Sequence, residues 1–267
     1  MGRLTLLLFL MTKLTYGFTL NNNIGAAFDK EEVSINVAAH TCANLGITND
    51  ELLSLAEEAG ELFWNRVHTS SLILKRGALV SVATAFQTGK ACTNAPASSC
   101  DINSALVVSS DILISCNTEP TNFSNSPSVL GVTVPNNFSG RTINGALILV
   151  NDNGSNSFQG LGRQEKVAVL AHEIGHAVGL GHSSLDKNLM YFQSVATRET
   201  LGWDDVDGIT YLYPVEQPLS GCGTIELQDQ GPEKGLLTLI FGLLLALAIG
   251  RTWQKSGRAW STPARNC

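Results

Sequence analysis

The chain has 267 residues, of which 44% are hydrophobic and 15% are charged, and its formal net charge at pH 7 is −6. A chain of this length and composition can bury a sizeable single core. The negative charge, and the lack of a long basic run in the central part of the sequence, argue against nucleic acid as a partner.

The first residues are typical of a targeting sequence. A short positive segment at Met1–Arg3 precedes an apolar run from Leu4 to Met11, and small residues near Gly17 would admit a signal peptidase. Residues 1–17 are therefore predicted to be a signal peptide. The alternative is an uncleaved anchor, which is disfavoured because Lys13 keeps the apolar run well below membrane-spanning length.

One folded domain is predicted for residues 18–215. Residues 33–37 alternate between apolar and polar side chains, as a half-buried strand does. Residues 48–51 have the spacing of a capping box, and apolar residues at helical spacing follow from Leu52 to Val67. The first half of the domain is therefore predicted to begin with a strand and a helix.

Further strands are predicted at residues 105–108 and 112–115, and at the short apolar run Ala146–Val150. The Asn-, Ser- and Pro-rich segment 117–141 between them is predicted to be a polar loop. The next loop, residues 151–157, offers oxygen atoms to Ca²⁺. Because it holds only one carboxylate, a plain turn is favoured, and calcium is kept as an alternative cofactor.

Six cysteines fit an oxidising compartment if the chain is exported. Four lie in the predicted domain, where bridges among them are expected but their pairing stays open. Cys222 lies in a patch of small residues that is either a lipidation or sorting site, or an unpaired or linker-stapling cysteine. The six are Cys42, Cys92, Cys100, Cys116, Cys222 and Cys267.

One stretch of the chain has the spacing of a zinc-binding centre. If residues 164–178 are helical, His172 and His176 lie one turn apart on one face. Gly179 can adopt the positive φ that ends the helix, so that the chain returns His182 as a third nitrogen ligand. Three neutral imidazoles leave the fourth zinc position open for water, which is the catalytic arrangement.

Glu173 lies beside the first of these ligands and is not itself one. It is the predicted general base, which accepts a proton from a zinc-acidified water and passes it to the leaving amine. The alternative is that the histidines belong to an ordinary amphipathic helix. That alternative is disfavoured because an apolar stripe at helical spacing is complete without them. The stripe consists of Val167, Leu170, Ala171, Ile174 and Val178.

From about Val167 to Pro214 the sequence resembles the metzincins, and among these most the matrixins (matrix metalloprotease-like peptidases). Ser183 directly follows the third histidine, and residues 188–191 resemble the Met-turn, with Met190 in the floor beneath the metal. Leu201–Pro214 is similar to the final matrixin helix with its paired aspartates. The resemblance implies an α+β zincin domain with a twisted, mostly parallel sheet, an active-site helix and a C-terminal helix.

The resemblance also implies a zinc-dependent endopeptidase that acts on extended protein or peptide substrates. The predicted substrate-binding residues form an edge strand to which the substrate adds as an antiparallel strand. They are Ala146, Leu147, Ile148, Leu149 and Val150. The sequence departs from animal matrixins because only His40 and His68 remain outside the motif, so a second, structural zinc site cannot be built from histidines. An alternative function is a surface-anchored binding or adhesive module that keeps the fold and uses zinc for stability only.

The end of the chain is predicted to be a membrane anchor. Residues 216–234 are predicted to be a linker, and residues 235–250 are sixteen residues without a charge that are predicted to span a membrane. Residues 251–267 then form a basic cytoplasmic tail, and the catalytic domain faces the extracellular or periplasmic side. A buried C-terminal helix is the alternative, disfavoured because the segment has no polar face. Whether the anchor is retained or removed by processing stays open.

Overall fold

The computed structural model describes residues 17–40, 42–93, 100–193 and 197–215, all within the first of the two units into which the chain divides, Met1–Glu216. Nearly all of the predicted signal peptide lies outside the described residues. So do the linker, the membrane segment, the basic tail and the last two cysteines, and these features stay predictions. Among the described residues, no helix is long and apolar enough to cross a membrane.

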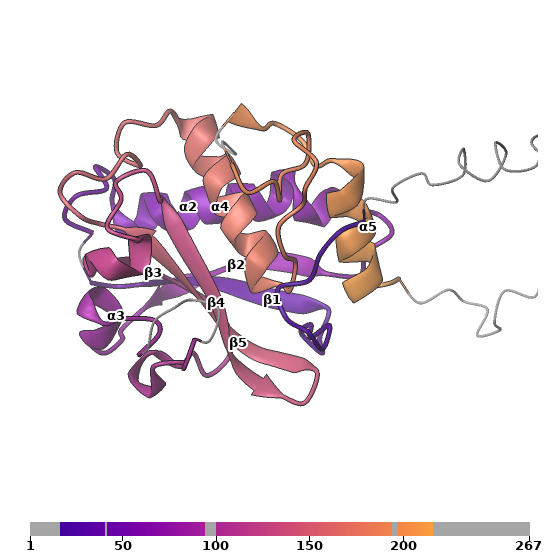
Figure 1. The fold of residues 1–267 in the computed structure, drawn as a ribbon, viewed down its shortest axis with the longest axis horizontal. Coiled ribbons are helices and arrows are strands. Elements are labelled where there is room, and N and C mark those ends of the chain that lie inside the picture. Colours follow the sequence, from indigo (N-terminus) through magenta and orange to yellow (C-terminus); the bar gives the residue numbers. More distant parts are fainter. Residues whose placement is uncertain (1–16, 41, 94–99, 194–196, 216–267) are drawn as a thin grey trace, which may run out of the picture. The chain divides into compact units, whose positions relative to one another are not determined.

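A single five-stranded sheet, in the order β2-β1-β3-β5-β4, forms the centre of the described domain (Figure 1). The strands β1 (Glu32–Ala38), β2 (Ile73–Val80), β3 (Asp111–Asn117) and β5 (Thr142–Asn151) run parallel to one another. Only β4 (Gly131–Ser139) is antiparallel, paired with β5. The predicted α+β fold with a mostly parallel sheet is therefore confirmed.

Two long helices, α2 (Asn49–Leu62) and α4 (Arg163–Ala177), pack on the same face of this sheet (Figure 1). The predicted cap of α2 is present, since the Thr48 side chain accepts the backbone N–H of Glu51 at 3.2 Å. α4 begins after Gly162, whose N–H donates to a Glu165 carboxylate oxygen at 2.7 Å. A shorter helix, α5 (Trp203–Leu212), lies near the end of the described residues.

Hydrophobic residues fill both faces of the sheet, because successive strand side chains point to opposite sides. One set of strand side chains is buried on the face under α2 and α4. The other set is buried on the opposite face, where the short helix α3 (Ala85–Thr88) packs. The first set includes Ile35, Ile112, Ile114 and Ile148, and the second includes Phe86, Leu113, Phe123, Leu147 and Leu149.

The prediction that Ala146–Val150 is an edge strand is wrong. These residues lie in β5, which pairs with β3 on one side and with β4 on the other, and each is no more than 1% exposed. The edge at this end of the sheet is β4, inside the segment 117–141 that the sequence predicts to be a loop. Val132 and Val134 pack against the core, whereas polar residues and Pro135 between and after them hide the alternating pattern.

Two further differences concern short segments. Residues 105–108 do not form a strand, because a 3-10 turn at Ser104–Leu106 begins where the Asn103 side chain accepts the Ala105 N–H. Strand β2 was not predicted. Its exposed pattern reflects its place at the other edge of the sheet, where few of its side chains are buried.

The four cysteines of the domain form two disulfides, Cys42–Cys116 and Cys92–Cys100. This confirms that they pair among themselves, and it fits an extracellular protein from an oxidising compartment. Asp152 is the one carboxylate of the loop 151–157, where calcium stays an alternative. Both oxygens of the fully buried Asp152 accept backbone N–H groups, at 2.9 Å from Ala43 and 2.6 Å from Asn44.

Candidate active site

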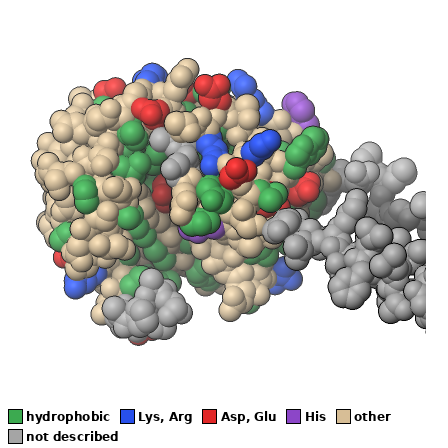
Figure 2. Space-filling model, turned by 45° about the horizontal axis from the view of Figure 1, so that its top comes forward, with side chains coloured by type: hydrophobic (Ala, Val, Ile, Leu, Met, Phe, Trp, Pro, Cys, Tyr) green, Lys and Arg blue, Asp and Glu red, His purple; other side chains and the backbone are tan. Residues whose placement is uncertain are grey.

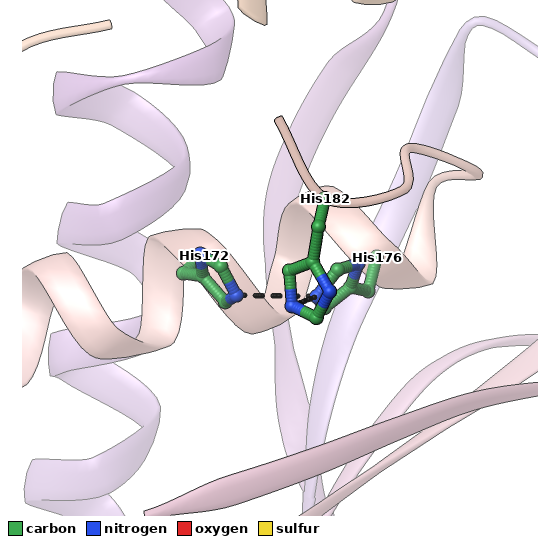
Figure 3. Close-up of side chains that lie close together, drawn as sticks. All are labelled: His172, His176 and His182. Carbon is green, nitrogen blue, oxygen red and sulfur yellow. Dashed lines mark hydrogen bonds between the residues drawn. The ribbon is translucent and has the colours of Figure 1, made fainter. Parts of the chain in front are cut away.

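Helix α4 and the turn after it bring the three predicted histidines together (Figure 3). His172 and His176 project from α4, and the chain then turns through Gly179, whose φ is +110°. A side chain at Gly179 would come within 2.6 Å of the Ala26 carbonyl oxygen, so both the backbone angle and the space require glycine. One nitrogen from each of His172, His176 and His182 lies within 4.8 Å of the others.

The N-terminal segment holds the third histidine in place. The Thr19 hydroxyl donates to the His182 carbonyl oxygen at 2.5 Å, and the Gly181 N–H donates to the Thr19 carbonyl oxygen at 2.8 Å. Because these bonds fix the backbone on both sides of the His182 Cα, the imidazole is directed back toward α4. Residues far apart in the sequence therefore position this side chain.

Backbone carbonyl groups set the tautomers of the two helical histidines. His172 Nδ1 lies 2.7 Å from the Leu189 carbonyl oxygen, and His176 Nδ1 lies 2.8 Å from that of Leu180. Since a carbonyl only accepts, each Nδ1 carries the proton and each Nε2 keeps a lone pair. An outer hydrogen bond of this kind is what orients a metal-binding histidine.

The Nε2 lone pairs converge at a spacing that suits a zinc ion. Nε2 of His176 lies 3.1 Å from that of His172 and 3.2 Å from that of His182. Two tetrahedral nitrogen ligands at ordinary zinc–nitrogen distances are about 3.3 Å apart. The donor type, the tautomers and the spacing therefore all fit a zinc ion held by these three side chains.

Burial keeps the histidines in the form that binds a metal. Desolvation lowers the pKa of His172 and of His176 to about 4, and it also lowers the pKa of His182, the most exposed of the three. All three are neutral at pH 7, so that a metal ion does not have to displace a proton from them.

Glu173 lies next to these ligands, on the side of α4 that faces strand β4. Its side chain is buried, and burial raises its pKa above the usual value of 4.5. The Thr133 hydroxyl in β4 lies 2.6 Å from Glu173 Oε2. The sequence did not single out Thr133, since it lies in the segment predicted to be a loop.

Met190 and Trp64 pack directly against the active-site helix at Gly175. A side chain at Gly175 would overlap Met190 Sδ and lie 2.7 Å from Trp64 Cζ2. Trp64 also donates its ring N–H to the Ala171 carbonyl oxygen at 2.9 Å. Met190 is thus buried against the helix that carries the ligands, and the neighbouring Leu189 supplies the carbonyl that orients His172.

The paired aspartates of α5, Asp204 and Asp205, accept hydrogen bonds from the segment that follows the third histidine. Asp205 accepts the backbone N–H groups of Leu189 at 2.6 Å and of Met190 at 3.0 Å. The Ser183 hydroxyl donates to Asp204 at 2.5 Å. Both carboxylates are buried, and burial raises the pKa of Asp205 against the effect of the N–H donors. They therefore join α5 to the turn that contacts the histidines.

Strand β4 presents part of its main chain along the open edge of the sheet. The Asn151 N–H donates to the Leu130 carbonyl oxygen at 3.0 Å, which fixes the alternation of the ladder. In that register Gly131 and Thr133 occupy the pairs without mutual hydrogen bonds, so their N–H and C=O groups point away from β5. Within the described parts of the chain, no other strand pairs with this side of β4.

Sequence reasoning missed the partners that hold the site together. Two of them, Gly131 and Thr133, lie in strand β4, inside the segment predicted to be a loop. The carbonyl groups of Leu180 and Leu189 carry no signal in the sequence, because every residue has one.

In Figure 2, hydrophobic side chains gather in the middle of the face shown, with a histidine partly visible among them.

Two histidines on a helix and a third in the turn after it, with an adjacent carboxylate and an open antiparallel strand, form the arrangement that a zinc metalloendopeptidase needs. Comparison with known proteins finds similarity to one family over part of the chain. The profile of the matrixin family, peptidase family M10, matches residues 107–214. The domain is therefore matrixin-like, as the sequence predicts.

Two relatives support this assignment. Metalloendoproteinase 2-MMP of Arabidopsis thaliana is 47% identical over 60 residues, which are 21% of this chain and 15% of the relative. The interstitial collagenase of Sus scrofa is 44% identical over 81 residues, which are 29% of this chain and 17% of the relative. The similarity thus covers less than a fifth of each relative's length.

Proposed function

We propose that this protein is a zinc-dependent endopeptidase in which His172, His176 and His182 hold the ion and Glu173 is the general base. The observation that carries the proposal is the convergence of three Nε2 lone pairs beside a buried carboxylate. When bound, zinc would act as a Lewis acid and lower the pKa of a water molecule far below its value in bulk water, towards about 7.

Glu173 has the properties that a proton carrier needs. Its raised pKa makes the carboxylate a stronger base than an exposed glutamate, closer to neutral pH, where proton transfer in both directions is efficient. It would accept the proton of the attacking water and then deliver it to the amine that leaves. Its place on α4 beside His172 keeps it near the reacting atoms without making it a ligand.

The substrate is proposed to be an extended segment of a protein or peptide that adds to the edge of the sheet at β4. The outward N–H and C=O groups of Gly131 and Thr133 offer the main-chain pairing of an antiparallel strand. Pro135, two residues on in the same orientation, has no N–H to offer, and therefore limits the pairing in that direction. This assigns to β4 the role that was predicted for Ala146–Val150.

The protein is further proposed to be exported and tethered by residues 235–250. The two disulfides support export. The sixteen uncharged residues and the basic residues after them support the tether.

The proposed reaction is tested on the full chain with a quenched fluorescent peptide. Chelation should abolish cleavage, and stoichiometric zinc should restore it. Cleavage that persists without metal, or that zinc does not restore, would overturn the proposal.

The strand pairing is tested separately by N-methylating successive amides of the peptide. Losses of kcat/KM should recur at every second residue, each of roughly 2- to 10-fold, because alternate amides face β4. Losses without this period would exclude strand addition and leave the chemistry unaffected.

A further inference from the structure

The side chain of Glu173, the proposed general base, lies against two residues on the same face of strand β4. The Thr133 hydroxyl lies 2.6 Å from Glu173 Oε2 and 3.2 Å from the Glu173 carbonyl oxygen. At Gly131, a Cβ atom would lie 2.8 Å from Glu173 Cδ and 2.9 Å from Oε1. The carboxyl group therefore rests against the strand where one residue has no side chain and another supplies a donor.

The shorter contact identifies the direction of the hydrogen bond. A threonine hydroxyl has one proton, and 2.6 Å is the usual separation of a hydroxyl that donates to an ionised carboxylate. The carbonyl oxygen at 3.2 Å is then a weaker second acceptor. Threonine is also branched at Cβ, so its hydroxyl has few χ1 positions available within a strand.

We propose that Thr133 is a positioning residue for the general base, in addition to its main-chain role at the strand edge. Its hydroxyl fixes Oε2 of Glu173 and leaves Oε1 for proton transfer, while Gly131 provides the room for the carboxyl group. Because the backbone of Thr133 faces the proposed substrate edge, the residue that pairs with the substrate also orients the base. This inference rests on the proposed function.

The test compares two replacements of Thr133 in the full chain. Thr133→Val keeps the shape of the side chain and removes the hydroxyl, whereas Thr133→Ser keeps the hydroxyl. Thr142→Val, in the same hairpin, is the matched control for removal of a hydroxyl from the sheet. Zinc content, KM and kcat are measured for each variant.

The proposal predicts that Thr133→Val binds zinc and keeps its KM but loses roughly 10- to 100-fold in kcat, as expected for a lost hydrogen bond to a charged group. Thr133→Ser should recover most of kcat, and Thr142→Val should match the parent. An unchanged kcat in Thr133→Val, a loss of zinc in that variant, or failure of serine to restore kcat would overturn the proposal.

A second readout needs neither metal nor turnover. In the zinc-free full chain with ¹³C-labelled glutamate carboxyl groups, the Glu173 signal, assigned with Glu173→Gln, should shift in Thr133→Val and stay near the parent position in Thr133→Ser. An unshifted signal in Thr133→Val would show that the hydroxyl does not contact the base. If the parent cleaves no peptide, the proposed function fails, whereas this signal still decides the contact. If Thr133→Val does not fold, Thr133→Ala takes its place against Thr133→Ser.

Discussion

Removing the Cys42–Cys116 disulfide should destabilise the domain much more than removing Cys92–Cys100. The first joins residues 74 positions apart and the second joins residues 8 positions apart. If a cross-link stabilises by restricting the unfolded chain, these loops correspond to about 4.5 and about 2.6 kcal/mol of unfolding free energy at 25 °C. The expected difference is therefore about 2 kcal/mol.

The structure adds to this difference. Cys42 and Cys116 are buried, and the bridge ties the segment before α2 to the end of β3. Truncating both side chains to alanine also leaves a small cavity beneath the helices, which adds to the loss in the same direction.

The assay is urea unfolding of the full chain, of Cys42→Ala/Cys116→Ala and of Cys92→Ala/Cys100→Ala, followed by tryptophan fluorescence. The fully reduced parent serves as the common reference. Equal losses for the two pairs, or a larger loss for Cys92–Cys100, would refute the reasoning from loop length.

Three further outcomes are expected. Burial raises the pKa of Glu173 in the folded state above 4.5, so ionisation of this carboxyl group opposes folding at pH 7. The zinc-free Glu173→Gln variant should therefore have a larger free energy of unfolding in urea at pH 7 than the parent, by about 1.4 kcal/mol for every tenfold change in the acid dissociation constant. That advantage should shrink as pH falls toward 4.5, and an advantage independent of pH would contradict it. Gly175→Ala should destabilise by about 1–3 kcal/mol and reduce activity, since the added methyl group overlaps Met190 and approaches Trp64; unchanged unfolding would show that the contact relaxes freely. Removal of residues 216–267 should leave a soluble, active domain, because the described core lies before them; aggregation in gel filtration would show that the tail belongs to the core.

The parts of the fold that could be predicted are those where local pattern and tertiary position agree. The capping residue Thr48 begins a helix with one buried face, and the apolar stripe marks α4, which is buried on nearly all sides; both helices were predicted. Strand β4 escaped prediction because its partly buried Val132 and Val134 stand among residues typical of loops, and two of those residues, Pro135 and Asn136, are themselves buried. Edge position permits those residues, and it cannot be recognised before the neighbouring strands are placed.

The same reasoning explains the error at Ala146–Val150. A continuous apolar run is typical of a strand buried on both faces in the interior of a sheet. The family resemblance suggested an edge, although five consecutive apolar residues already favoured an inner strand. At the metal centre the ligand spacing was local and therefore readable. The contacts of Thr133 and Leu189 with the site join residues 17 to 40 positions apart, and no local pattern encodes them.

The most direct test of the central claim measures zinc content and peptide cleavage in Glu173→Ala and His176→Ala side by side. Glu173→Ala should retain a full equivalent of zinc, since its carboxylate is not a ligand, and lose roughly 10²- to 10⁴-fold in rate. His176→Ala should lose both zinc and activity, because two imidazoles do not complete the site. If Glu173→Ala cleaves peptide as fast as the parent, Glu173 is not the general base and the proposed mechanism is contradicted.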